Sequence, residues 1–375
     1  MTSQYDEVWM RRALKLAEKG QGLTSPNPVV GACVVKNGRL VSEGFHRYFG
    51  GPHAEIEALQ KAGEKAHGAT LYVTLEPCST YGKTPPCTEA IKKAKISQVV
   101  IGAIDPNPKH RRQGVSLLKK LGIRVRARVL RSECELQNEA FSKWTRTGIP
   151  FVILKMAQSL DGKIASRTGE SRWISGPQAR NWVHGLRASV DAILVGKNTV
   201  LQDDPRLTVR PRLVEKGSER NGTIRKTPWR IILDEKGASS PQARIFQSQG
   251  PVILVCSKKL VQGVTKKFQR VKVTILPVGS NHGRLNLSEL LKCLGSLGIA
   301  SLLVEGGGEV AWSFFEGKFV DKIEWVVAPK IIGGRDAKTS VEGFGVKSLA
   351  KTPMIRWTRT DRLGTDILLE GYVKH

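Results

Sequence analysis

Apolar residues in the first part of the chain alternate between helical spacing and short continuous runs. Trp9, Ala13 and Leu16 recur at helical spacing within residues 6–19, which predicts an amphipathic opening helix. An Asn-Gly pair at residues 37–38 stands between two apolar runs and predicts a tight hairpin turn. The same patterns predict strands at 29–35, 39–45, 69–75, 98–104 and 123–130, and helices at 53–63, 87–94 and 112–122. This alternation is typical of a layered α/β sheet.

The pattern breaks in the middle of the chain and then starts again. Gly148 and Pro150 interrupt it near residues 141–150, where we expect a domain boundary. Beyond it we expect strands at 151–157, 190–195, 229–234, 251–256 and 301–304, helices at 176–187 and 286–297, and a polar surface loop at 214–227. The length of 375 residues also suits two domains, 1–146 and 147–375.

Composition narrows the class of protein further. Hydrophobic residues make up 40% of the chain, and no apolar run approaches the roughly 18 residues that a membrane helix needs. Asp6 and Glu7 interrupt the N-terminus, which therefore does not read as a secretory signal. Six cysteines are too sparse for a disulfide scaffold. We expect a soluble cytoplasmic protein with no membrane partner.

The net charge of +27 admits two interpretations. It could attract nucleic acid, or small polyanions such as sugar phosphates and NADP. Lys and Arg are instead scattered along the chain and not gathered in one segment, which favours a generally basic surface. The charge alone does not decide the function.

One histidine and two cysteines form a candidate metal centre. His53 opens a predicted helix, Cys78 follows a predicted strand, and Cys87 begins the next helix. These three residues can fill three corners of a zinc tetrahedron and leave the fourth for water, whereas a structural site would normally show four protein ligands. Glu55, two residues after His53, stands where it could carry a proton for that water. The pattern matches the zinc-deaminase signature that is itself a standard example of this chemistry.

The spacing of the two cysteines indicates which deaminase this is. Cytidine and tRNA-adenosine deaminases usually have two residues between them, whereas eight stand between Cys78 and Cys87 and end in Thr-Pro-Pro. This segment resembles the bifunctional deaminase–reductase family of riboflavin biosynthesis. In the first half the resemblance is carried by PNPVVG (26–31), GFH (44–46), GPHAE (51–55), LEPC (75–78) and DPNP (105–108).

The resemblance implies a cytidine-deaminase-like three-layer α/β/α domain acting on a diaminopyrimidinone ribosylamine phosphate. Zn²⁺ would be held by His53, Cys78 and Cys87, one ion per chain, with Glu55 as the catalytic proton carrier. The family positions expected around base, ribose and phosphate are Asn27, His46, Lys83, Thr84, Asp105 and Asn107. Taken singly, each of these polar residues could equally serve an ordinary turn.

The second half has no Gly-x-Gly-x-x-Gly after a strand, so a Rossmann fingerprint is absent. A Gly-rich turn, VEGGGE (304–309), instead joins a strand to an apolar helix, where backbone N–H groups could meet a pyrophosphate. The same family resemblance continues in KMAQSLDG (155–162), GESRWIS (169–175), LRA (186–188), the segment 196–210 and APK (328–330). It implies a dihydrofolate-reductase-like α/β domain that uses NADPH.

The resemblance also assigns residues to this second site. NADPH would contact Ala157, Trp173, Thr199, Asp203, Gly307, Gly308, Glu309, Val310, Ala311, Trp312 and Ser313. The ribosylamine phosphate would contact Lys155, Ser171, Arg187, Leu207, Arg210 and Glu305, with the two arginines on the phosphate. Hydride would reach C1 of the opened ribose. Either Lys155 or Glu305 could supply the proton, and either could instead only position the substrate. Trp173 could also be a plain core residue.

Three departures from the family pattern leave alternatives open. Thr80 stands where a histidine is frequent, Arg111-Arg112 occupy a segment that is usually small, and Glu235 replaces a frequent serine near the cofactor. One half could therefore be inactive. The charge also suggests an RNA-editing deaminase or RNA-binding protein, and a non-enzymatic zinc scaffold is a further alternative. We expect small-molecule substrates, no nucleic acid, and a homodimer or larger assembly formed through the reductase domains.

Overall fold

The computed structural model describes residues 4–81, 85–108, 110–210 and 227–374. Its contacts divide the chain into two compact units, Met1–Gly148 and Ile149–His375, which are described separately below. The end expected for the first domain, residue 146, lies within the last helix of the first unit, α6 (Glu139–Thr147). Among the described helices, none has both the length and the apolar character needed to cross a lipid bilayer.

A five-stranded mixed sheet forms the centre of the first unit. Its order is β2–β1–β3–β4–β5; β1 pairs antiparallel with β2 and β3, and β3, β4 and β5 run parallel. The strands are β1 (Gly31–Lys36), β2 (Arg39–Phe45), β3 (Thr70–Leu75), β4 (Gln98–Ala103) and β5 (Arg124–Ala127). Each lies within three residues of its predicted ends. Asn37 and Gly38 have φ of 50° and 75°, the left-handed backbone that a tight hairpin requires, so the predicted turn is confirmed.

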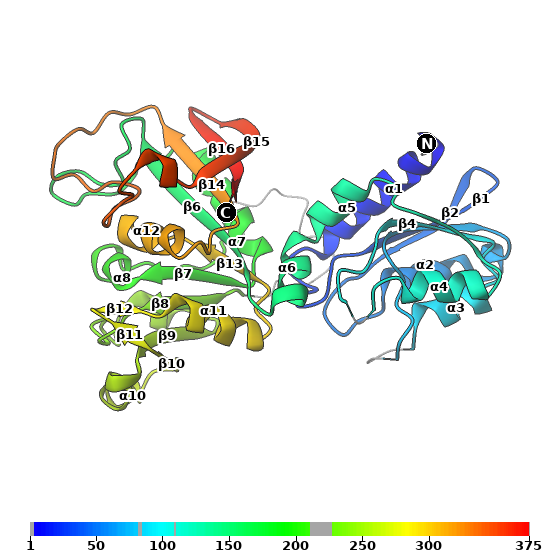
Figure 1. The fold of residues 1–375 in the computed structure, drawn as a ribbon, viewed down its shortest axis with the longest axis horizontal. Coiled ribbons are helices and arrows are strands. Elements are labelled where there is room, and N and C mark those ends of the chain that lie inside the picture. The colour runs from blue at the N-terminus through cyan, green and yellow to red at the C-terminus, as the bar shows by residue number, and fades with distance from the viewer. Residues whose placement is uncertain (1–3, 82–84, 109, 211–226, 375) are drawn as a thin grey trace. The chain divides into compact units, whose positions relative to one another are not determined.

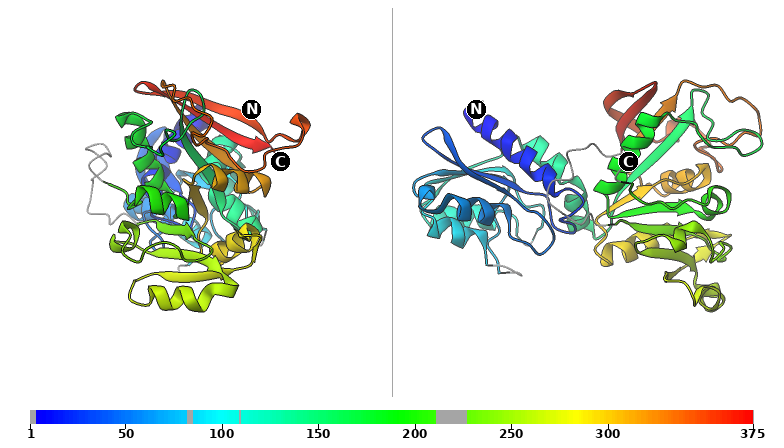
Figure 2. Two further views of the ribbon diagram at one scale, coloured as in Figure 1. Left: turned by 90° about the vertical axis from the view of Figure 1, so that its left-hand side faces the viewer. Right: turned by 180° about the vertical axis from the view of Figure 1, so that it is seen from behind.

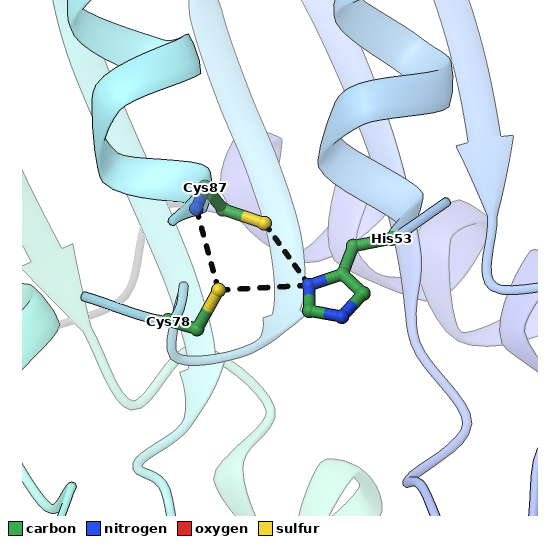
Figure 3. A group of neighbouring side chains, drawn as sticks. All are labelled: His53, Cys78 and Cys87. Carbon is green, nitrogen blue, oxygen red and sulfur yellow. Dashed lines mark hydrogen bonds between the residues drawn. The ribbon is translucent and has the colours of Figure 1, made fainter. Parts of the chain in front are cut away.

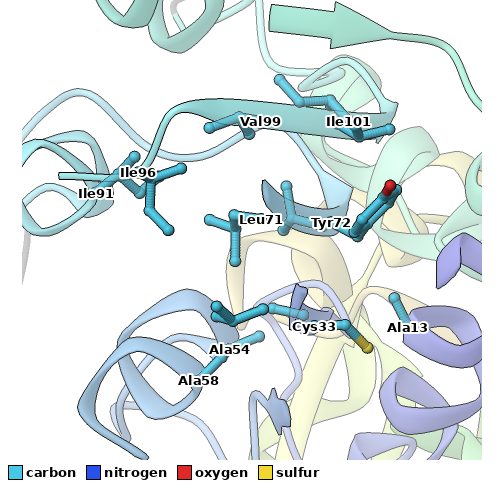
Figure 4. Close-up of a cluster of buried hydrophobic side chains, with 14 of the residues drawn as sticks. Ala13, Cys33, Ala54, Ala58, Leu71, Tyr72, Ile91, Ile96, Val99 and Ile101 are labelled. Atoms are coloured by element: carbon cyan, nitrogen blue, oxygen red, sulfur yellow. The ribbon is translucent and has the colours of Figure 1, made fainter. Parts of the chain in front are cut away.

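Helices cover both faces of this sheet (Figure 1). The helices α1 (Gln4–Ala17) and α5 (Arg131–Gln137) lie on one face, and α2 (Ala54–Ala62), α3 (Cys87–Lys93) and α4 (Gln113–Lys120) lie on the other. Short 3-10 turns follow α1 and α2 at Glu18–Gly20 and Gly63–Ala66. Figure 4 shows part of the core that results, with Ala13 of α1, Ala54 and Ala58 of α2, and the strand residues Leu71 and Ile101. The three-layer α/β/α arrangement expected for this half is confirmed.

The second unit is built on a nine-stranded sheet. Its order is β10–β9–β8–β7–β13–β6–β14–β16–β15, parallel from β10 to β14 and antiparallel in the β15–β16 hairpin. The strands are β6 (Phe151–Ser159), β7 (Ala192–Gly196), β8 (Trp229–Leu233), β9 (Val252–Ser257), β10 (Thr274–Val278), β13 (Ser301–Val304), β14 (Lys322–Ala328), β15 (Met354–Leu363) and β16 (Asp366–Lys374). A separate small hairpin pairs β11 (Ser280–Asn281) with β12 (Arg284–Leu285).

The helices of this unit pack on two sides of its sheet (Figures 1 and 2). One apolar core joins the strands to α11 (Leu287–Ser296) and α12 (Gly308–Glu316). Two further clusters join them to α7 (Pro177–Ser189), α8 (Lys197–Asp203), α9 (Arg244–Gln247) and α10 (Val261–Phe268). Short 3-10 turns lie at Lys258–Leu260 and Leu349–Lys351. The predicted strands and helices of this half are confirmed to within two residues, while all but the last residue of the predicted loop 214–227 lies outside the described residues.

The parallel strands carry the candidate site residues at one edge of the sheet. The carboxyl ends of neighbouring parallel strands meet at the same edge, and ligands of open α/β sheets bind there. Along the strand order, this edge presents Glu235 just beyond β8, Gly196 at the end of β7, Glu305 after β13 and Ala157 near the end of β6.

Candidate zinc and nucleotide sites

The first unit brings His53, Cys78 and Cys87 together (Figure 3). His53 caps the start of α2, Cys78 follows β3, and Cys87 is the first residue of α3. The Nδ1 atom of His53 lies 3.2 Å from Sγ of Cys87 and 3.6 Å from Sγ of Cys78. All three potential ligand atoms lie within 4.8 Å of one another. Sequence spacing alone predicted this constellation.

The donor set fits a zinc ion. One imidazole nitrogen and two thiolates are the ligands that Zn²⁺ prefers, and three of them leave a position for water. The backbone N–H of Cys87 donates to Sγ of Cys78 at 3.3 Å. The hydrogen bond from the Cys87 thiol, together with the His53 ring and this N–H, lowers the pKa of Cys78, which therefore favours the thiolate that metal binding requires. The same hydrogen bond and burial raise the pKa of Cys87, so Cys87 keeps its proton until a metal ion displaces it.

Glu55 is buried beside these ligands. It is the second residue of α2 and is 3% exposed. Burial raises the pKa of its carboxyl, and the neighbouring His53 ring opposes that rise. A buried carboxyl whose pKa is raised toward neutrality is suited to taking up and releasing a proton.

Asn27 and His46 form a second polar pair next to the ligands. The His46 ring lies 5.5 Å from the His53 ring, centroid to centroid. Its Nδ1 lies 2.9 Å from the carbonyl oxygen of Pro52, and its Nε2 lies 3.2 Å from the Asn27 amide nitrogen. Nδ1–H therefore donates to the carbonyl and Nε2 accepts from the amide. Burial lowers the pKa of His46, which agrees with a neutral ring that fixes the Asn27 side chain.

Asp105 and Asn107 lie on the loop that follows β4. The Asp105 carboxylate accepts the Asn107 N–H at 2.8 Å, and burial raises the pKa of Asp105. Glu76, which the sequence interpretation did not single out, holds this loop. The residue is 5% exposed, and its carboxylate accepts the backbone N–H groups of Asp105, Arg112 and Val115 at 3.0–3.1 Å. Lys83 and Thr84 lie outside the described residues.

The second unit has a cavity of about 890 Å³ at the carboxyl edge of its sheet. Seven of the residues predicted to contact NADPH line it: Thr199, Asp203, Gly307, Gly308, Glu309, Val310 and Ser313. Ala311 and Trp312 are instead buried in the protein core, 0% and 8% exposed. Successive residues of a helix point in different directions around its axis, so in a continuous stretch such as 307–313 some side chains face the cavity and others face the core.

Three consecutive glycines, Gly306 to Gly308, lead into α12, and two of them, Gly307 and Gly308, line this cavity. A Cβ on Gly306 would lie 2.6 Å from Val310, and one on Gly308 would lie 2.6 Å from the carbonyl oxygen of Thr339. These two glycines therefore allow close packing of α12. A Cβ on Gly307 would meet nothing within 4 Å, so it would fill open space at the start of the helix. Exposed N–H groups and a clear approach to them are what a pyrophosphate needs, and the cavity fits a dinucleotide.

A smaller cavity of about 360 Å³ adjoins the larger one. It is lined by all six residues predicted to bind the reductase substrate: Lys155, Ser171, Arg187, Leu207, Arg210 and Glu305. Ala157 and Trp173, predicted to contact NADPH, also line it. Trp173 is 60% exposed, so it is not a core residue. Both cavities share Ile164, Ser171, Thr199 and Asp203. A ligand in one would therefore meet a ligand in the other at these four residues.

A buried ion pair organises the smaller cavity. Arg187 donates from Nε and Nη2 to the two oxygens of Glu305, both at 2.7 Å, with side-chain exposures of 14% and 9%. Burial alone would raise the pKa of Glu305, but Arg187 and Lys155 hold it below its ordinary value. Burial lowers the pKa of Lys155, only partly countered by Glu305. The paired guanidinium keeps Glu305 charged beside an amine that releases its proton readily.

His184 is a further residue of this cavity that the sequence interpretation missed. Its Nε2 accepts from Nε and Nη2 of Arg210 at 3.2 and 3.1 Å, and the residue is 3% exposed. Burial, with Arg187 and Arg210 nearby, lowers the pKa of His184 to about 4, so the ring is neutral. It lies three residues before Arg187 on α7, on the same helix face, which is the signal that could have revealed it.

These two sites define a class: a zinc-dependent deaminase domain joined to a reductase domain with a dinucleotide cavity. Comparison with known families agrees. Residues 3–103 match the cytidine and deoxycytidylate deaminase zinc-binding region, and residues 150–369 match the RibD C-terminal domain. The chain belongs to the RibD family of riboflavin-biosynthesis proteins. Its two units accordingly have cytidine-deaminase-like and dihydrofolate-reductase-like folds.

Relatives match along nearly the whole chain. The riboflavin biosynthesis protein RibD of Aquifex aeolicus is 41% identical over 98% of this chain and 99% of its own, and that of Escherichia coli is 40% identical over 97% and 98%. The structure of Acinetobacter baumannii RibD (form 1) has a TM-score of 0.88 at 35% identity, with 99% of both chains covered. A Thermotoga maritima structure, a diaminohydroxyphosphoribosylaminopyrimidine deaminase/5-amino-6-(5-phosphoribosylamino)uracil reductase, has a TM-score of 0.86 at 37% identity, also with 99% of both chains covered.

Proposed function

We propose that this chain performs both reactions named for its Thermotoga maritima relative. The first unit deaminates 2,5-diamino-6-(5-phosphoribosylamino)pyrimidin-4(3H)-one to 5-amino-6-(5-phosphoribosylamino)uracil. The second unit then reduces the ribosyl group to ribityl with NADPH. The observation that carries the proposal is the convergence of His53, Cys78 and Cys87 beside the buried Glu55, in a chain that also has the adjoining cavities of a two-ligand reductase.

His53, Cys78 and Cys87 would hold the zinc ion of the deaminase. Zinc, when bound, activates water for attack near neutral pH. Glu55 would receive the first proton of that water and pass it to a ring nitrogen of the pyrimidine. It would then take the proton of the hydroxyl group added to the ring carbon and give it to the amino group, which leaves as ammonia. The raised pKa of Glu55 suits each of these transfers, because the same carboxyl must both accept and donate.

The substrate of the deaminase would meet four described residues around this centre. Asn27, oriented by His46, would hold the base, and Asp105 with Asn107 would hold the ribose from the loop after β4. Lys83 and Thr84 remain our candidates for the phosphate, Lys83 as a point charge.

NADPH would lie in the larger cavity, with its pyrophosphate at Gly307 and the start of α12. NADPH, when bound, supplies the hydride for the reduction. Arg210, oriented by His184, would hold the substrate phosphate, while Arg187 keeps Glu305 charged. The opened ribose presents a C1=N bond, so C1 gains the hydride and the nitrogen gains a proton. Lys155 is the group in this cavity best suited to give that proton, because burial lowers its pKa.

The test follows ammonia release and NADPH oxidation separately in zinc-loaded protein given the diaminopyrimidinone substrate. We expect ammonia without NADPH, and oxidation once NADPH is added. Glu55→Gln should stop ammonia release while the protein still oxidises NADPH when given the deaminated intermediate. Ammonia without any oxidation would leave a deaminase with a silent second unit. Neither signal, together with saturable binding and deamination of tRNA at physiological salt, would favour the RNA-editing alternative.

We further propose a homo-oligomer formed through the second unit, in the cytoplasm, with small-molecule partners only. The strand β15 supports this, because it is the last strand in the order of the described sheet and its Met354 and Trp357 are 61% and 53% exposed. All six cysteines are free, as in a reducing compartment. Light scattering should give a dimer or larger assembly, and Trp357→Lys should shift it toward the monomer; an unchanged mass would place the interface elsewhere.

A further inference from the structure

The two cavities of the second unit fix the direction in which a dinucleotide must lie. Hydride transfer requires the nicotinamide at the residues that both cavities share, such as Thr199 and Asp203. The pyrophosphate belongs near Gly307, after β13. The larger cavity continues from there to Glu235, after β8, and to the β11–β12 hairpin, neither of which lines the smaller cavity. The adenosine half therefore reaches Glu235.

Glu235 presents a carboxylate to this end of the cavity. The residue is partly buried, and its backbone carbonyl accepts the Ser257 N–H at 3.0 Å, which anchors it beside β9. Within the described part of the chain, its carboxylate has no hydrogen bond or ion pair. It lies at the hairpin, because a Cβ on Gly283 would be 3.8 Å from its Oε2. An unpaired carboxylate at an adenosine ribose can accept from the 2′- and 3′-hydroxyls, but it repels a 2′-phosphate.

The cations that line the larger cavity do not offset this charge. Arg284 is paired with Glu316 at 3.1 Å, and the Lys338 ammonium lies 3.9 Å from Glu342. Of the lining cations in the described residues, this leaves Lys197, which follows β7 and lies between Gly307 and Glu235 in strand order. A 2′-phosphate at Glu235 would thus meet a like charge with few free cations around it.

We propose that Glu235 sets the coenzyme preference of this chain, weakening the discrimination in favour of NADPH so that NADH is also a coenzyme. The inference rests on the proposed placement of the dinucleotide in the larger cavity. The 2′-hydroxyl of NADH donates to the Glu235 carboxylate, while the 2′-phosphate of NADPH is repelled by it. This preference depends on one side chain, because the backbone at Gly307 would contact the pyrophosphate, which the two coenzymes share.

The experiment measures the Kd of NADPH and of NADH by calorimetry, without substrate, for wild type and four variants. Glu235→Ser and Glu235→Gln remove the carboxylate. Glu309→Gln is the matched control, since Glu309 also lines the cavity but at the helix start. Gly307→Val fills the open space at the proposed pyrophosphate position. The two coenzymes should bind wild type within about tenfold of each other, and Glu235→Ser should shift the ratio about tenfold toward NADPH, the order expected for like charges a few Å apart.

The variants distinguish a wrong placement of the dinucleotide from a wrong role for Glu235. Glu309→Gln should change both affinities alike and leave their ratio unchanged. Gly307→Val should weaken both coenzymes at least tenfold; if it weakens neither, the placement of the dinucleotide is wrong and the proposed function of this cavity falls with it. If Gly307→Val weakens both but the ratio in Glu235→Ser and Glu235→Gln equals that of wild type, the placement holds and the role of Glu235 is refuted. Tight NADPH binding to wild type with NADH more than a hundredfold weaker would also refute it.

Discussion

Replacing Glu76 by glutamine is the sharpest single test of how the deaminase site is held. Glu76 is 5% exposed, and its carboxylate accepts three backbone N–H groups: those of Asp105 and Arg112 at Oε2, and that of Val115 at Oε1. The Asp105 N–H lies near the start of the loop that carries Asp105 and Asn107, and the Val115 N–H lies in the first turn of α4. Glutamine keeps the size of the side chain but replaces one acceptor oxygen by an N–H₂ donor.

The magnitude follows from these three bonds. The amide oxygen can still accept two of the N–H groups, each losing about 1 kcal/mol because the acceptor is no longer charged. The third N–H is left facing a donor, and an unsatisfied buried N–H costs about 1–3 kcal/mol. Burying an amide instead of a carboxylate recovers part of this. We expect the first unit to lose about 2–4 kcal/mol of its free energy of unfolding, or roughly 10 °C in its melting temperature.

The same chain supplies its own control for the assay. Glu76→Gln should raise KM for ammonia release about tenfold, because the loop with Asp105 and Asn107 loses its anchor, while zinc content and NADPH oxidation with the deaminated intermediate stay unchanged. Glu64→Gln, an exposed glutamate of the same unit, should alter neither KM nor the melting temperature. A variant with normal KM and a melting temperature within 2 °C of wild type, roughly the shift for half a kcal/mol, would refute the anchoring role of Glu76.

Three further outcomes follow from the sites. His184→Leu should raise KM of the reductase for its phosphorylated substrate about tenfold at saturating NADPH, and His184→Gln, which keeps an acceptor for Arg210, should raise it less; equal effects would contradict orientation by hydrogen bonding. The pKa of His184 is lowered to about 4 in the folded protein, so below about pH 6.5 the unfolded chain binds more protons than the folded chain. The free energy of unfolding of the second unit, measured with urea, should therefore fall between about pH 6.5 and about pH 4. It should fall less steeply in His184→Gln. Chelating zinc should abolish ammonia release but leave NADPH oxidation with the intermediate intact, and added zinc should restore the former.

The parts of the fold that the sequence predicted are those with local signals. Strands such as β7 and β13 are continuous apolar runs because helices cover both of their faces. The Asn37–Gly38 turn needs only its own two residues. In contrast, β15 is exposed along most of its length and rich in arginine, so it has no apolar alternation to detect. The helix α6 has no buried residue among its nine, and it was missed because Gly148 and Pro150, which directly follow it, marked this stretch as a break in the pattern.

The candidate sites divide in a similar way. The convergence of His53, Cys78 and Cys87 was predicted because each of them lies in a short motif with its own chemistry. The bidentate pair of Arg187 and Glu305 spans 118 residues, and the bonds of Glu76 span 29 to 39 residues. Such partners meet only because strand order brings them to one edge of a sheet, and no spacing in the sequence encodes that meeting. Motif resemblance could name Arg187 and Glu305 separately, but not their pairing.

Two departures from the family pattern, Arg112 and Glu235, differ in whether the backbone or the side chain of the residue lies at the site. Arg112 has a left-handed φ of 62° and an exposed side chain, and the site uses only its backbone N–H, which Glu76 accepts. Gly114, where a Cβ would lie 2.1 Å from the Pro77 carbonyl oxygen, keeps the close approach of the loop. A bulky basic segment is therefore tolerated there. Glu235 differs from Arg112, because Glu235 lines the larger cavity, where we propose that the coenzyme binds, so this departure should change what the enzyme binds.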